Sequence, residues 1–363
     1  TGGNYSFFTE MPVRGRTGFP WAEIAADGSS LIGKHDGTGG EVSVGTVTSQ
    51  LLYEIGGPRY FGPDVTARFD TVGCISPVPD RVHLWGTRGG PPPPTLKVAM
   101  NEWGGYRNDV RVALTGLDVE AKAAWVEEMF WAVCPTPREE FADVTTALVR
   151  TDKDDPASNE EATAIWRMTV KDGDARKVGR PIFDAVVELS LATIPGFYPL
   201  DAGAAEGKPF GVYRPALVPA SLVPQEVVVA GDRTFVESVA LPLADQAGSL
   251  PISTAATPSD PQGPPTELGP TVRVPLGRVV GARSGDKGGN ANLGVFTRTD
   301  AEYAWLDSFL TVDRLQELLP ETASLRVERH RFPLLRALNF VIVGLLQEGV
   351  AASTRQDAQA KSL

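Results

Sequence analysis

The sequence has little of what marks membrane proteins and nucleic-acid binders. No apolar run comes near the roughly 20 residues that span a bilayer, and the longest, 337–346, is interrupted by Asn339 and Gly344. Basic charge is in deficit, with 34 Lys and Arg against 45 Asp and Glu and a net charge of -11. These absences exclude a transmembrane helix and argue against nucleic acid or an anionic membrane surface as a partner.

Cysteine and histidine are also scarce. Cys74 and Cys134 alone cannot build a disulfide framework or a thiolate metal site, and we interpret them as buried free thiols of a reducing, cytoplasmic compartment. The three histidines, His35, His83 and His330, form no zinc-binding pattern, so we predict no metal ligand and no cofactor. Counting alone leaves a carboxylate-rich Mg²⁺ or Ca²⁺ site open.

What is present favours a mixed α/β or α+β protein, and 363 residues suit one large and one small domain. Residues 1–240 form a larger, glycine-rich α/β domain in this interpretation, with a strand at 41–47 and a helix at 119–132 capped by Asp118. Residues 241–270 are rich in Pro, Ala and Ser and indicate a linker. Residues 271–363 alternate strands and helices as in a small α+β sandwich.

A glycine-rich segment between two expected strands, 272–282 and 292–298, is the clearest candidate site. It places Arg283, Ser284, Asp286, Lys287 and Asn290 among three glycines. Backbone N–H groups in such turns bind anions, and the two basic residues add positive charge that Asp286 could hold in place. The alternative is a hairpin turn with an internal ion pair. The spacing is neither a Walker A loop nor a dinucleotide fingerprint.

Two further clusters could carry chemistry. Lys34, His35 and Asp36 precede Gly37-Thr38-Gly39-Gly40, and a turn there could pair His35 with Asp36 as an acid/base group, although a structural histidine fits as well.

The other cluster is Thr1-Gly2-Gly3-Asn4, which has no signal-peptide pattern. An N-terminal Thr can use its hydroxyl as nucleophile and its own amine as base, while Gly2, Gly3 and Asn4 bind an oxyanion. Alternatively, the chain simply begins at Thr1.

Several of these motifs together resemble the acyclic terpene utilisation (AtuA) family of bacteria and fungi. The matching stretches are Thr1-Gly2-Gly3-Asn4-Tyr5, 20–24, 34–40, 50–55, 63–65, Arg283-Ser284-Gly285-Asp286-Lys287-Gly288, Leu338-Asn339-Phe340 and Asp357-x-x-x-Lys361. Ala360 stands where the family usually has Gly before the Lys. The resemblance implies that the region from about 272 is the family's ferredoxin-fold domain and that the larger part is the C-terminal portion of its main domain.

In this family a sizeable segment usually precedes the Thr-Gly-Gly motif. The resemblance therefore leads us to expect self-cleavage before Thr1, a second chain from the same precursor and a homo-oligomer. Our first hypothesis is a hydrolase of acyl or amide bonds with Thr1 as nucleophile, assisted by Lys34, His35 and Asp36. The second is a non-hydrolytic protein that handles acyl-CoA in terpene or branched-acyl catabolism, with the Arg283–Lys287 segment contacting phosphates. The third is a non-catalytic binding subunit.

Overall fold

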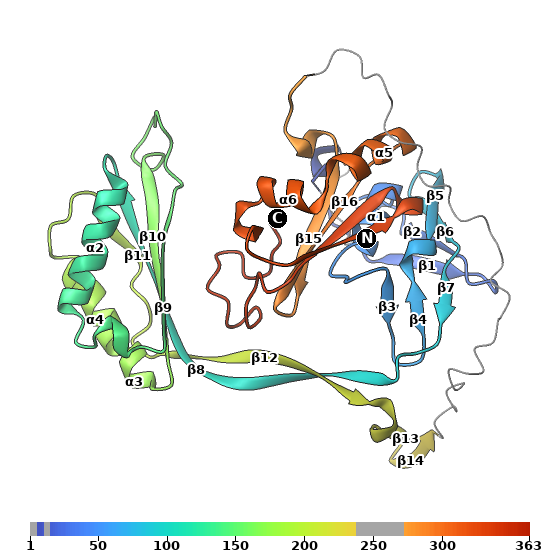
Figure 1. Ribbon diagram of the computed structural model, residues 1–363, viewed down its shortest axis with the longest axis horizontal. Helices are drawn as coiled ribbons and strands as arrows, with labels where there is room; N and C mark the ends of the chain where they lie inside the picture. The colour runs from blue at the N-terminus through green and yellow to red at the C-terminus, as the bar shows by residue number, and fades with distance from the viewer. Residues whose placement is uncertain (1–5, 11–14, 237–271) are drawn as a thin grey trace. The chain divides into compact units, whose positions relative to one another are not determined.

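The computed structural model describes residues 6–10, 15–236 and 272–363. The chain forms two compact units (Figure 1). The first comprises residues 1–100, 215–350 and 357–363, and the second comprises residues 101–214 and 351–356. The linker expected at 241–270 lies outside the described residues.

The second unit is an antiparallel sheet with helices on one face. Its strand order is β11 (Phe197–Asp201), β8 (Thr95–Thr115), β10 (Thr163–Asp172) and β9 (Asp143–Val149), and β12 (Lys208–Pro219) also pairs with β8. Alternate side chains of β8 and β10, including Val110, Val112, Trp166 and Met168, pack against the helices α2 (Val119–Val133), α3 (Ala175–Val178) and α4 (Arg180–Leu189). The other residues of these strands therefore face away from the helices.

The helix predicted at 119–132 is confirmed, because Val119, Ala123, Val126 and Phe130 recur at helical spacing and are buried. The predicted cap is wrong in detail. Asp118 precedes the helix in the left-handed region, with φ 57°, and its side chain makes no capping hydrogen bond.

In the first unit, residues 272–350 and 357–363 form the ferredoxin-like part of the protein. Its sheet has the order β15 (Gly281–Lys287), β16 (Asn290–Phe296), β18 (Ala337–Ile342) and β17 (Val327–Phe332), and its helices are α5 (Asp300–Phe309) and α6 (Val312–Leu318). Thr299 and Glu302 close a capping box on α5, and the Thr311 hydroxyl accepts from the backbone N–H of Arg314 at the start of α6. This arrangement confirms the predicted mixed α+β class.

Within the described residues, the rest of the first unit is built from small sheets, the short helix α1 (Val44–Leu51) and a few 3-10 turns. The sheets have the orders β1 (Pro20–Ile24), β2 (Ser30–Lys34), β6 (Arg81–Trp85), β5 (Gly73–Val78); then β3 (Arg59–Phe61), β4 (Thr66–Arg68), β7 (Arg88–Gly90); and finally β13 (Gln225–Val229) with β14 (Asp232–Val236).

The strand predicted at 41–47 is wrong, because α1 (Val44–Leu51) begins there. Ser43 and Thr46 form a reciprocal capping box, and this local bonding outweighs the alternating pattern.

A shared apolar core joins α1 to the ferredoxin-like sheet. Val47, Leu52 and Ile55 cluster with Phe296 and Phe332, all less than 9% exposed. Gly294 of β16 makes this approach possible, because a Cβ there would lie 2.5 Å from Leu52 Cβ. The two parts therefore fold as one body, and the end of α1 rests on the sheet.

No helix in the part of the chain that the structure describes is long and apolar enough to cross a membrane.

Candidate functional site

The glycine-rich segment is a β-hairpin. Strand β15 continues to Lys287, β16 starts at Asn290, and Gly288-Gly289 makes the turn with φ 66° at Gly288. The bounds predicted for the two strands, 272–282 and 292–298, are therefore wrong. Most of the residues expected to form a loop between them belong to β15 and β16. Because side chains alternate along a strand, positions 283, 285 and 287 share one face, and Ser284 and Asp286 share the other.

The first face of β15 meets the turn after α1. The Arg283 guanidinium carbon lies 4.1 Å from the centre of the Tyr53 ring, within the range of a cation–π contact. Lys287 Nζ donates to the Glu54 carbonyl oxygen at 2.9 Å. Gly285 lies between them, and a Cβ there would come within 2.8 Å of both Tyr53 and Glu54. The glycine is needed for this close approach.

Two buried amides fix the same turn. Asn292 Oδ1 accepts from the Glu54 backbone N–H at 2.8 Å, and Asn292 Nδ2 donates to the Leu52 carbonyl oxygen at 2.7 Å. Asn339 Nδ2 donates to the Gly56 carbonyl oxygen at 2.6 Å. Glu54 has φ 56°, a left-handed conformation that costs energy in a non-glycine residue. Bonds to its N–H and its carbonyl hold that conformation in place.

Lys361 adds a cation from the end of the described chain. Its Nζ donates to the Tyr53 hydroxyl and to Glu54 Oε1, the latter at 2.7 Å, and lies 3.4 Å from Asp286 Oδ1. Burial lowers the pKa of Lys361, but its bonds to Glu54 and Tyr53 outweigh burial and the net shift is upward. Burial likewise raises the pKa of Glu54, and the same contacts lower it by more. Because the pKa of Lys361 is raised and that of Glu54 is lowered, both side chains are charged at neutral pH.

The turn that presents Lys361 is fixed locally. Asp357 Oδ2 accepts from both the backbone N–H and the hydroxyl of Ser362 at 2.7 Å. Ala360 has φ 51°, which explains why the family resemblance implies glycine at this position.

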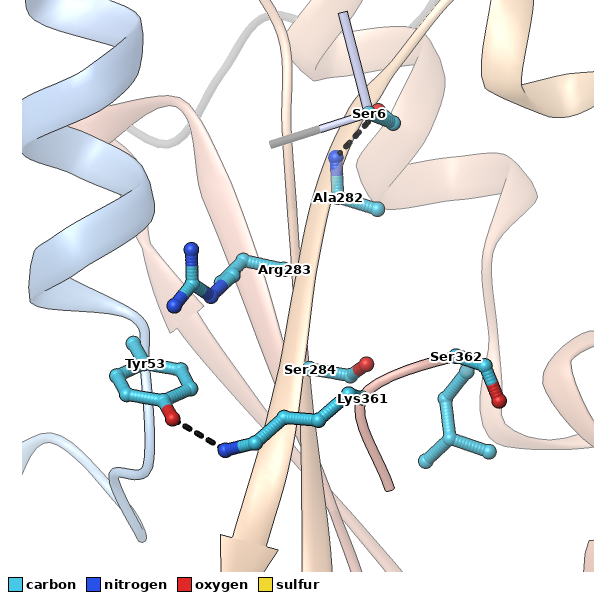
Figure 2. Close-up of a pocket in the computed structure, with 8 residues that line it drawn as sticks. Ser6, Tyr53, Ala282, Arg283, Ser284, Lys361 and Ser362 are labelled. Carbon is cyan, nitrogen blue, oxygen red and sulfur yellow. Dashed lines mark hydrogen bonds between the residues drawn. The ribbon is translucent and has the colours of Figure 1, made fainter. Parts of the chain in front are cut away.

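These elements enclose a pocket of about 470 Å³ (Figure 2). Its lining residues are Ser6, Tyr53, Ala282, Arg283, Ser284, Lys361, Ser362 and Leu363. Ser284 is 3% exposed, and its hydroxyl is buried with no hydrogen-bond partner within the described structure. Ser6 Oγ accepts from the backbone N–H of Ala282 at 3.0 Å, which joins residues 6–10 to this site. The pocket thus combines two cations, a phenol and an unsatisfied hydroxyl.

The sequence-predicted residues fall into four groups. Thr1, Gly2, Gly3 and Asn4 lie outside the described residues. Arg283 and Ser284 line the pocket, and Asp286 reaches its rim through Lys361. Lys287 and Asn290 do not line the pocket. Lys287 is partly buried, which lowers its pKa. Asn290 Oδ1 accepts a hydrogen bond from the Gly344 N–H at 2.9 Å.

The cluster of Lys34, His35 and Asp36 forms a turn after β2. Lys34 Nζ donates to the Thr38 carbonyl oxygen at 2.6 Å and lies 3.6 Å from Asp80 Oδ2. His35 and Asp36 are exposed, and none of the three residues lines the pocket. Their catalytic role stays a prediction.

Sequence reasoning missed the pocket roles of Tyr53 and Lys361. Both belong to stretches that carry the family resemblance, and this was the only signal for them. No group of three or more His, Cys, Asp or Glu side chains within residues 6–10, 15–236 and 272–363 is arranged to hold a metal ion.

The fold and site thus define an α+β protein whose ferredoxin-like part completes a pocket with the segment after α1. Comparison with family models matches residues 1–229 to the acyclic terpene utilisation family protein AtuA and residues 274–363 to the AtuA ferredoxin-like domain. The chain therefore belongs to the AtuA family. No curated protein and no solved structure matches it.

Proposed function

We propose that the chain handles acyl substrates of terpene or branched-acyl catabolism, and that the pocket of Figure 2 binds the anionic group of a carboxylic acid or of its CoA ester. One observation carries this proposal. In a chain with a net charge of -11, the pocket presents Arg283, Lys361 and the buried hydroxyl of Ser284. A buried hydroxyl without a partner is costly unless a ligand satisfies it.

The charge state of Lys361 favours binding over amine chemistry. Because its pKa is raised, Lys361 remains an ammonium at neutral pH and is a poor nucleophile or base. The ammonium donates to the Tyr53 hydroxyl, and Tyr53 also hydrogen-bonds the Glu54 side chain, so the phenol is part of the same charged network. Arg283 and Lys361 can therefore neutralise the negative charge of a bound ligand. This supports the non-hydrolytic interpretation.

The test measures ligand-induced stabilisation. Melting temperatures of the wild-type protein would be compared with free CoA, a branched acyl-CoA and the matching free acid, at constant ionic strength. A ligand at about 100 times its Kd stabilises the folded state by about 2.7 kcal/mol. We expect a rise that Lys361→Met abolishes. Lys153→Met is the matched control, because Lys153 is an exposed, ion-paired lysine outside the pocket.

Equal stabilisation of wild type and Lys361→Met by all three compounds would contradict this proposal, as would no stabilisation at all. A response to the free acid alone would restrict the substrate class to carboxylates. A response to free CoA that Lys361→Met abolishes would instead indicate that the pocket recognises a phosphate.

A hydrolase with Thr1 as nucleophile is the second candidate, favoured by the presence of Ser6 in the pocket wall. The mechanism requires a free α-amine at Thr1. Intact-mass measurement of the product of the full gene tests that requirement. An uncleaved product, or full activity on acyl esters and amides in Thr1→Ala, would rule this candidate out.

A further inference from the structure

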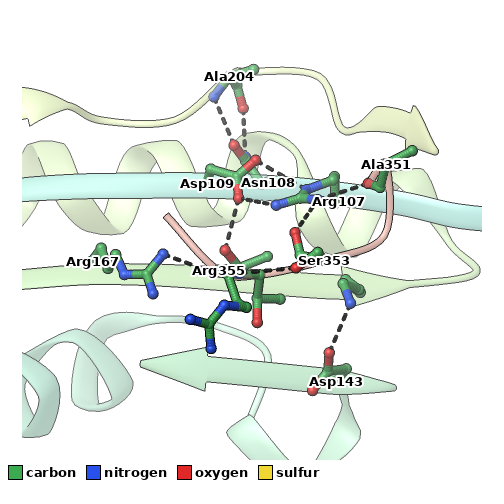
Figure 3. Close-up of polar contacts among 12 residues, drawn as sticks. Arg107, Asn108, Asp109, Asp143, Arg167, Ala204, Ala351, Ser353 and Arg355 are labelled. Carbon is green, nitrogen blue, oxygen red and sulfur yellow. Dashed lines mark hydrogen bonds and ion pairs between the residues drawn. The ribbon is translucent and has the colours of Figure 1, made fainter. Parts of the chain in front are cut away.

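The second unit carries an unusual charge arrangement on the face of its sheet that points away from the helices. Residues 107, 109 and 111 of β8 share this face with residues 167, 169 and 171 of β10, because their neighbours in sequence enter the core. The segment 351–356 lies along the same face (Figure 3), where Arg107 Nη1 donates to the carbonyl oxygens of Ala351 and Ser353.

Two cations of this face are neutralised locally. Arg107 pairs with Asp109 through two hydrogen bonds, at 2.6 and 3.1 Å. Lys171 Nζ lies 3.1 Å from Asp143 Oδ2 on β9. These pairs need no external anion.

Arg111 and Arg167 are different. They are directly opposite each other in the β8–β10 register, and like charges in that position destabilise a sheet. Across the described ranges, neither has a carboxylate within 4 Å. Asp201 of β11 is the other register partner of Arg111, but its Oδ1 accepts from the Gly203 N–H at 3.0 Å.

Arg167 is also incompletely satisfied. Its Nη1 donates to the Thr354 carbonyl oxygen at 2.7 Å, while its Nε is buried with no hydrogen-bond partner in the described structure. Arg355 lies next to it (Figure 3). Burial, followed by the charges of Arg355 and Arg111, lowers the pKa of Arg167, and Asp109 only partly offsets this. The bond to Thr354 gives one N–H group of Arg167 a partner in the segment 351–356. It leaves the buried Nε of Arg167 without a partner in the described structure, and it does not account for Arg111 directly opposite.

We propose that Arg111, Arg167 and Arg355 form a binding site for a phosphate group in the second unit. A guanidinium offers several N–H donors in a planar fork that matches phosphate oxygens, and a dianion among three arginines removes the repulsion between them. The ligand is either free phosphate or a small molecule that carries a phosphate monoester.

Isothermal titration calorimetry on the full chain tests the site, with inorganic phosphate and glycerol phosphate as probes at constant ionic strength. We expect saturable binding that Arg111→Gln weakens by about tenfold or more. Arg111 is exposed, so its replacement leaves the core intact. Tighter binding of glycerol phosphate would identify a phosphate ester as the natural ligand, and equal binding would identify free phosphate.

Two control variants make the test specific. Arg176→Gln removes the same charge from an exposed ion pair with Asp174 in the same unit, and it should leave the affinity unchanged. Lys361→Met should also leave it unchanged, which separates this site from the pocket of the first unit. No saturable binding in the wild type would overturn the proposal. If Arg111→Gln and Arg176→Gln weakened phosphate binding equally, the proposal would also be overturned, because the loss of affinity would then follow from the net charge of the unit rather than from a specific site.

Discussion

The buried amide of Asn292 makes the sharpest stability prediction. Asn292 is 0% exposed. It bonds to the Leu52 carbonyl, the Glu54 N–H and Asn339 Oδ1, at 2.7 to 2.8 Å. In Asn292→Ala these three buried groups lose their partner at once. We expect this variant to be among the most destabilising single changes in the first unit.

The magnitude follows from the cost of buried polar groups. Each unsatisfied buried donor or acceptor costs about 1–3 kcal/mol, so three of them give about 3 kcal/mol even at the lower end. Water that enters the cavity left by the amide would satisfy some of these groups, which makes the lower end the better expectation. A typical domain has only about 5–15 kcal/mol of stability in total.

Urea unfolding followed by circular dichroism measures the effect as a lower midpoint. Asn290→Ala is the matched control on the same strand. Among the residues that the structure describes, the Asn290 side chain makes one hydrogen bond, from the Gly344 N–H, so this variant should cost about 1 kcal/mol. If Asn292→Ala unfolds at the same urea concentration as wild type or as Asn290→Ala, the bonds between the sheet and the turn after α1 do not stabilise the fold as argued.

Three further changes have defined outcomes. Gly294→Ala should cost about 1–3 kcal/mol in thermal unfolding, because its Cβ would meet Leu52 Cβ at 2.5 Å, whereas Gly173→Ala, with open space, should change little. Glu54→Gln should cost about 1 kcal/mol or less at pH 7, because the pair is more than one third exposed. Since the folded pKa of Glu54 is lowered from 4.5, its stabilisation is present above that value. The difference between wild type and variant should shrink as the pH falls below 4.5. Burial raises the pKa of the Cys74 thiol, so a thiol reagent should label it at neutral pH only after unfolding.

Local patterns predicted the regular elements better than the site. The helix at 119–132 could be predicted from its helix-forming composition and the helical spacing of its apolar residues. Its buried face carries Val126 and Phe130, whereas Trp125 is 46% exposed. The pattern at 41–47 misled, because alternation over a few residues does not reveal a capping box. A hairpin turn was one of the two interpretations of the segment between the expected strands, and the structure has that turn at Gly288-Gly289. The strands extend further into the segment than predicted, because glycines that permit close packing look like glycines that permit turns.

The pocket itself lay beyond local inference for a physical reason. Lys361 reaches Tyr53 across 308 positions of sequence, and no periodicity encodes such a contact. The same holds for Asp286, whose described contact is Lys361 rather than a neighbour in the hairpin. Only the family resemblance selected these distant stretches together.

The stretches that carry the family resemblance come from two domains and meet at one pocket. The turn after α1 belongs to the segment matched by the main family model, whereas Arg283, Ser284 and Lys361 belong to the ferredoxin-like domain. Each side supplies part of the pocket, and each also satisfies buried groups of the other through the amide bonds and the shared apolar core. Separation would therefore strip the cations from the pocket and, in the same step, expose Leu52 and leave buried backbone groups unpaired. The ferredoxin-like domain is thus a structural completion of the main domain, and the pocket exists only when both are folded together.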